Sequence, residues 1–134
     1  MSSSGQLAYL DSSALVKLVL EETETIALTS FLEGWPARVS SIIAYVEVHR
    51  AARREAERAS ARADEVLELV DLIELDRAVV DLARALEPAE LRSLDAIHLA
   101  SALSVGAGLG AFVTYDRRLY EAAGQVGLEA VAPA

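Results

Sequence analysis

Apolar and polar positions along the chain form two kinds of segment, short apolar runs and longer stretches with apolar residues at helical spacing. The short runs are predicted strands, and they lie at 6–10, 38–41, 72–75, 111–115 and 128–131. The longer stretches are predicted helices, and they lie at 14–21, 23–32, 42–60, 62–70, 77–86, 94–104 and beyond 116. Strands that alternate with helices predict a three-layer α/β/α domain with a central, mostly parallel sheet of four or five strands.

Length and composition agree with one folded domain. The chain has 134 residues, of which 53% are hydrophobic, and this is enough to bury a core without crosslinks. We expect a single domain over 1–134, with residues 1–5 as a disordered tail or cloning remnant. The absence of cysteine excludes disulfides and thiolate catalysis. The net charge of −9 disfavours a protein that binds nucleic acid or anionic membranes by charge alone.

One stretch, 96–115, is apolar enough to suggest a membrane span. It contains His98 and three glycines, and Asp95 and Asp116 flank it. A buried helix, a glycine turn and a buried strand explain this pattern better than a membrane span does. The N-terminus has no basic segment typical of a secretion signal. We therefore expect a cytoplasmic protein with no membrane association.

Four acidic residues lie outside the ordinary polar helix faces. Asp11 and Asp116 each follow a predicted strand, at the edge where parallel α/β sheets bind ligands. Asp95 lies in the first turn of an otherwise apolar helix, and Glu47 interrupts an apolar helical segment. Each has an ordinary structural explanation, because acids are common as helix caps and in first helical turns. Four carboxylates at one sheet edge would instead repel one another unless a cation such as Mg²⁺ or Mn²⁺ held them.

The same four acids carry a resemblance to a known family. They lie in the segments 9–15 (YLDSSAL), 93–100 (SLDAIHLA) and 114–119 (TYDRRL), with Glu47 between the first two. In order and spacing these segments resemble PIN-domain ribonucleases, and specifically VapC toxins of type II toxin–antitoxin systems. The resemblance implies a PIN fold whose four acids bind Mg²⁺ or Mn²⁺ and hydrolyse RNA.

The resemblance also implies supporting residues and partners. Ser13 and Thr114 are expected as hydroxyl groups beside the acids, with RNA as substrate and a VapB-type antitoxin as protein partner. The first helices carry more apolar residues than one core face needs. We interpret this surplus as a groove for a partner peptide, a homodimer face or additional core packing.

Neither histidine is required by this chemistry. His98 lies three residues after Asp95, where it could line the edge of the site, but we interpret it as a partly buried helix residue. His49 lies two residues after Glu47 and is expected to point elsewhere on its helix.

Positive charge is concentrated after Glu47. Between 50 and 62, five arginines oppose two glutamates, and Arg50, Arg54 and Arg58 follow Glu47 at helical spacing. This stripe is a candidate contact for RNA phosphates, and so is the pair Arg117 and Arg118 after the last acid. The alternative is a solvated helix with the ion pairs Arg53–Glu57 and Glu55–Arg58.

Two other functions fit the same pattern. A non-catalytic α/β binding module would use the acids only as helix caps. A metal-dependent phosphohydrolase of small molecules would use the acids but not the arginines.

Overall fold

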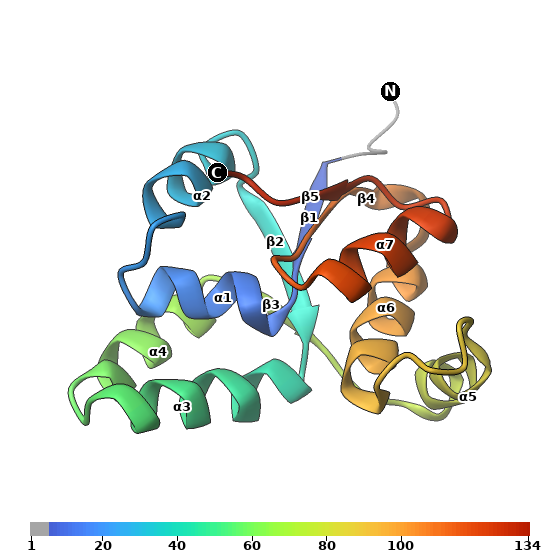
Figure 1. The fold of residues 1–134 in the computed structure, drawn as a ribbon, viewed down its shortest axis with the longest axis horizontal. Helices are drawn as coiled ribbons and strands as arrows, with labels where there is room; N and C mark the ends of the chain where they lie inside the picture. Colours follow the sequence, from blue (N-terminus) through green and yellow to red (C-terminus); the bar gives the residue numbers. More distant parts are fainter. Residues whose placement is uncertain (1–5) are drawn as a thin grey trace.

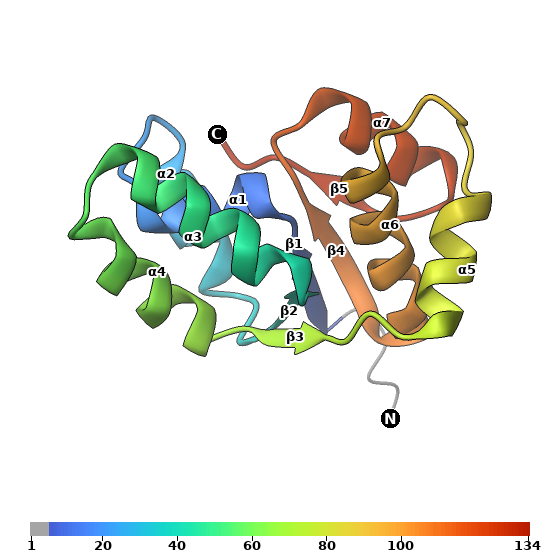
Figure 2. The same ribbon diagram turned by 90° about the horizontal axis from the view of Figure 1, so that it is seen from below.

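The structure is a computed structural model that describes residues 6–134, so the tail predicted at residues 1–5 lies outside the described part. Its centre is a parallel sheet of five strands in the order β3-β2-β1-β4-β5. The strands are β1 (Leu7–Leu10), β2 (Ala37–Ser41), β3 (Asp71–Ile73), β4 (Leu109–Val113) and β5 (Ala130–Val131). The predicted three-layer fold is confirmed, since helices cover both faces of this sheet (Figures 1 and 2).

The two helical layers come from the two halves of the chain. One face is covered by α1 (Ser12–Val19), α2 (Thr25–Leu32), α3 (Ile43–Glu55) and α4 (Ala59–Glu68). The other face is covered by α6 (Ser93–Val105) and α7 (Arg117–Gln125), with α5 (Arg77–Ala85) packed against α6, and a short 3₁₀ turn (Gly106–Gly108) precedes β4. Figure 2 shows the sheet between these two groups of helices.

The central strands β1 and β4 are apolar on both faces because both faces are covered. In β1, Ala8 and Leu10 belong to the core on the α1–α4 side, whereas Tyr9 belongs to the core on the α6–α7 side. In β4, Phe112 and Val113 divide between the two cores in the same way. The sheet therefore separates two buried cores, as the period of two along a strand requires.

The helix predicted over 42–60 was wrong in its extent. It ends at Glu55, Ala56 has an extended backbone (φ −164°), and the chain resumes as α4 at Ala59. Ala52 of α3 and Ala63 of α4 are buried in the same core, one on each side of this turn. Arg58 lies in this turn and not on the face of α3 that carries Arg50 and Arg54, so the predicted continuous stripe is broken.

The apolar stretch 96–115 folds as α6, the glycine turn and β4, as predicted. Between residues 6 and 134, no helix combines the length and the apolar character that crossing a membrane requires.

Candidate active site

The carboxyl ends of β1 and β4 place Asp11 at the centre of the site. Asp11 follows β1 directly and caps α1, and its Oδ1 accepts hydrogen bonds from the Ala14 amide (3.0 Å) and the Ser13 hydroxyl (2.7 Å). Its Oδ2 accepts from the Thr114 hydroxyl at 2.6 Å. Burial raises the pKa of Asp11, and the charge of His98 and these hydrogen bonds offset only part of that rise.

Ser13 and Thr114 also connect the two loops that follow β1 and β4. Ser13 Oγ accepts from the Tyr115 amide at 2.9 Å, and Thr114 Oγ1 accepts from the Asp116 amide at 3.1 Å. Each hydroxyl therefore donates to Asp11 while it holds the backbone beside Asp116. The two hydroxyl groups thus fix the backbone at Asp116 relative to the carboxylate of Asp11.

Glu47 reaches the site from α3, on the other side of the α1 N-terminus. Its Oε1 accepts hydrogen bonds from the Ser12 hydroxyl and from His98 Nε2, the latter at 2.8 Å. Burial would raise the pKa of Glu47, but the hydrogen bonds from His98 and Ser12 outweigh it, and the pKa lies below its usual value. Glu47 is therefore held as a carboxylate.

His98 has a larger role in the site than the sequence indicated. Only 2% of its surface is exposed, and its Nδ1 lies 2.7 Å from the Tyr9 hydroxyl. Because a carboxylate only accepts hydrogen bonds, the N–H group at Nε2 of His98 donates to Glu47. In the neutral ring, Nδ1 carries no proton and accepts the hydrogen bond from the Tyr9 hydroxyl. The i, i+3 spacing to Asp95 was the only sequence signal for this position, and nothing in the sequence indicated Tyr9 or Ser12.

Asp95 and Asp116 lie at the first turns of α6 and α7. Asp116 caps α7, and its Oδ1 accepts from the Leu119 amide at 3.0 Å. The pKa of Asp95 is raised, first by burial and then by the negative charges of Asp116 and Asp11, with His98 and Arg92 opposing the rise. Asp116 and Asp11 are therefore close enough to Asp95 to disfavour its ionisation.

We call Asp11, Glu47, Asp95 and Asp116 the carboxylate site. Within residues 6–134, no Lys or Arg forms an ion pair with any of the four. Oxygen ligands and excess negative charge suit a divalent cation such as Mg²⁺ or Mn²⁺. As the side chains stand, no three Asp, Glu or His residues of the described part are close enough together to hold an ion. The donor set thus fits the ion in chemistry and charge, and its side chains would have to turn toward it.

The arginines after Glu47 are exposed and free of the expected ion pairs. Arg50, Arg53 and Arg54 together line a shallow hollow of about 450 Å³ on α3. Neither the pair Arg53–Glu57 nor the pair Glu55–Arg58 occurs in the structure. Arg117 and Arg118 are exposed in the first turn of α7.

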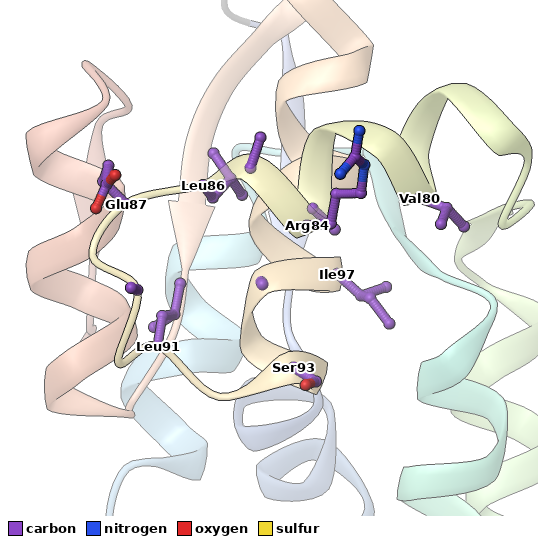
Figure 3. Close-up of a pocket in the computed structure, with 11 residues that line it drawn as sticks. Val80, Arg84, Leu86, Glu87, Leu91, Ser93 and Ile97 are labelled. Carbon is purple, nitrogen blue, oxygen red and sulfur yellow. The ribbon is translucent and has the colours of Figure 1, made fainter.

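His49 lies apart from the carboxylate site, as predicted. Its Nε2 pairs with Asp64 of α4 at 2.7 Å, and its Nδ1 donates to the Tyr45 carbonyl at 2.7 Å. Another hollow, of about 410 Å³, lies between α5 and the start of α6 (Figure 3). Its lining includes Leu86 and Ile97 but none of the four acids.

Sequence comparisons connect this arrangement to known proteins. The PIN-domain family matches residues 8–125. The chain is 46% identical over 125 residues to Ribonuclease VapC46 of Mycobacterium tuberculosis, across 93% of this chain and 96% of that protein. It is 38% identical over 132 residues to Ribonuclease VapC47 of the same species, across 95% of this chain and 97% of that protein.

Solved structures share the fold. The crystal structure of VapC20 from M. tuberculosis, described as a sarcin–ricin loop cleaving toxin, superposes with a TM-score of 0.74 and 16% identity, over 94% of this chain and 99% of that one. VapBC2 from Rickettsia felis, bound to a DNA fragment from its promoter, gives a TM-score of 0.75 with 12% identity, over 96% and 99% of the two chains.

Proposed function

This chain belongs to the PIN-domain family and, within it, to the VapC ribonucleases, and we propose that it is a toxin that hydrolyses RNA with a Mg²⁺ or Mn²⁺ ion at the carboxylate site. The observation that carries this proposal is that no Lys or Arg of residues 6–134 forms an ion pair with any of the four acids, while the charges of Asp116 and Asp11 add to burial in raising the pKa of Asp95. The relatives that are named ribonucleases supply the substrate class.

The contacts and charges around each acid suggest a different role for it. Asp11, Asp95 and Asp116 would hold the ion, since they are the acids whose charges oppose one another. Glu47, kept ionised by His98 and Ser12, would ligate the ion or orient the attacking water. Bound there, the ion would supply an acidified water and offset charge on the scissile phosphate. Ser13 and Thr114 would keep Asp11 in one orientation.

The test is RNA cleavage by protein stripped of metal and then supplied with Mg²⁺ or Mn²⁺. We expect Asp11→Asn and Asp95→Asn to lower the rate about a hundredfold or more, because several kcal/mol of charge stabilisation is lost. Asp71→Asn, which alters an exposed acid on β3, is the matched control and should keep wild-type activity. Full activity in the Asp11 and Asp95 variants would refute the site. Turnover of small phosphoesters without RNA cleavage would favour the phosphohydrolase.

We propose a VapB-type antitoxin as the protein partner. Three of the solved relatives are described as toxin–antitoxin or VapBC structures, which supports a partner for this chain. The apolar residues of α1 and α2 are divided, since Leu15, Leu28 and Leu32 are buried whereas Ile26 is 80% exposed. Co-expression with a small neighbouring gene product, followed by co-purification and loss of RNA cleavage, tests the partner. We also expect a homodimer in the cytoplasm, which light scattering and cell fractionation would check.

A further inference from the structure

A hollow beside Asp116 extends the carboxylate site along α7. It has a volume of about 390 Å³, and its lining includes Thr114, Asp116, Arg117, Tyr120 and Glu121. Thr114 and Asp116 also belong to the site already described, so the hollow opens directly from it. Its volume lies within the range of small-molecule binding pockets, so it can accommodate one nucleotide.

Tyr120 is the aromatic wall of this hollow. Its neighbour Leu119 is buried in the core, whereas Tyr120 is 42% exposed. Across residues 6–134, no other aromatic ring stacks on it and no hydrogen bond to its hydroxyl is found. An exposed ring of this kind offers its face to another planar group.

Two charged residues of α7, Arg117 and Glu121, line the hollow together with Tyr120. Arg117 precedes Tyr120 by three residues, and Glu121 directly follows it. Arg117 and Glu121 are therefore four residues apart and are neighbours on one face of α7. No ion pair joins them in the described structure, which leaves both groups available. An arginine suits a phosphate, and a carboxylate suits an amino group.

We propose that this hollow, the Tyr120 subsite, binds one unpaired nucleotide adjacent to the scissile phosphate of the RNA. The base stacks on Tyr120, Arg117 contacts a phosphate, and Glu121 accepts a hydrogen bond from an exocyclic amino group of the base. Uracil is the base disfavoured here, because it has no amino group and its single N–H lies between two carbonyl oxygens. The subsite rests on the proposed ribonuclease function and adds a base preference to it.

The occupant is single-stranded because a base must leave its stack before it can lie on a protein ring. The face of a ring binds any base, so the selectivity comes from Glu121 and the affinity from Tyr120. These two contributions can be removed separately.

The experiment maps the cut sites of wild type, Tyr120→Leu, Tyr120→Phe and Glu121→Gln on a random single-stranded RNA pool. A short RNA that contains a preferred cut site is then made with one abasic nucleotide at each flanking position, and kcat/KM is measured. Tyr45→Leu is the matched control, since Tyr45 is an exposed tyrosine of α3 that does not line the hollow.

We expect one flanking abasic position to cost wild type roughly ten- to hundredfold in kcat/KM, the usual effect of losing one base–aromatic stack. Tyr120→Leu should show a similar loss on intact RNA and no further loss at that position. Tyr120→Phe should show the same loss in kcat/KM at the abasic position as wild type does. Glu121→Gln should cleave RNA that carries uracil at this position. Tyr45→Leu should behave like wild type.

Two outcomes would overturn the subsite alone. One is RNA cleavage in which Tyr120→Leu retains the full abasic penalty at every position, and the other is an equal loss in Tyr45→Leu. An unchanged discrimination against uracil in Glu121→Gln would overturn the assigned role of Glu121. A wild-type protein that cuts no RNA would overturn the proposed function, and the subsite with it.

Discussion

The Nε2 atom of His98 lies 2.8 Å from Oε1 of Glu47, and this contact joins the two helical layers across the carboxyl edge of the sheet. Glu47 belongs to α3 on one face, and His98 belongs to α6 on the other. The imidazole is buried, and its other nitrogen, Nδ1, is hydrogen-bonded to the hydroxyl of Tyr9 in β1. The orientation of Glu47 is thus set by a residue from the opposite layer.

The first prediction concerns this contact. His98→Ala should lower the free energy of unfolding by about 2–5 kcal/mol, because it leaves a cavity and an unpaired Tyr9 hydroxyl. In a double-mutant cycle with Glu47→Gln, the coupling should be about 1–3 kcal/mol, measured by urea denaturation. The control is the pair His49 and Asp64, which has the same kind of contact at the surface, where coupling should stay below about 1 kcal/mol. Equal coupling in the two pairs would contradict the buried role of His98.

The second prediction is that Asp95→Asn stabilises the metal-free protein while it abolishes activity. Burial and the charges of Asp116 and Asp11 raise the pKa of Asp95, so its ionised form is disfavoured in the folded state. A neutral amide removes that repulsion, and Tm should rise by about 2–4 °C, the shift that 1 kcal/mol produces in a domain somewhat longer than this one.

The sign of the pH dependence follows from the same shift. A raised carboxyl pKa means that the folded state binds the proton more tightly than the unfolded state does. The contribution of Asp95 to stability is therefore least favourable above its folded pKa and improves as pH falls through it. Thermal melts without metal between pH 4 and 8 should show this component in wild type and not in Asp95→Asn. Asp71→Asn should melt like wild type at every pH, and a lower Tm for Asp95→Asn at pH 7 would contradict the argument.

The sequence predicted those parts of the site that depend on local signals. Asp11 and Asp116 were found because each follows an apolar strand and caps the next helix, and both features are visible within a few residues. The contact of His98 with Tyr9 joins positions 89 residues apart, and no local pattern reports it. The break at Ala56 was missed because good helix formers continue through it and no Gly or Pro marks it.

The third prediction concerns the hydroxyl of Thr114, which is buried and donates to Asp11 at 2.6 Å. Thr114→Val removes that donor and leaves the Asp116 amide without its acceptor, at a cost of about 1–3 kcal/mol in unfolding free energy. Losing a hydrogen bond to the carboxylate raises the pKa of Asp11 further. If Asp11 acts as a carboxylate, the acidic limb of the kcat/KM profile should move to higher pH. Thr114→Ser keeps the hydroxyl and should leave the limb in place, so a shift of equal size in the two variants would count against this role.

The fourth prediction tests the exposed arginines of α3. Arg50 and Arg54 follow Glu47 by three and seven residues, and an α-helix rises 1.5 Å per residue, so both lie within about 11 Å of it along the axis. An RNA strand that reaches the carboxylate site can therefore place its next phosphates against them. In an Asp95→Asn background, which prevents cleavage, the double variant Arg50→Gln/Arg54→Gln should bind single-stranded RNA more weakly.

The salt dependence of binding identifies the cause of that loss. Each lost phosphate contact lowers the slope of log K against log salt concentration by about 0.7, so the double variant should lose about 1.4. The control is Arg77→Gln/Arg84→Gln on α5, which removes the same charge but from arginines already paired with Asp81. Its slope should match that of the parent protein.

Arg58→Gln, in the turn after α3, should change the slope less than Arg50→Gln does, because the end of α3 at Glu55 takes Arg58 off the face that carries Arg50. Equal slopes for the α3 and α5 double variants would show that binding responds only to net charge and would exclude a phosphate track along α3.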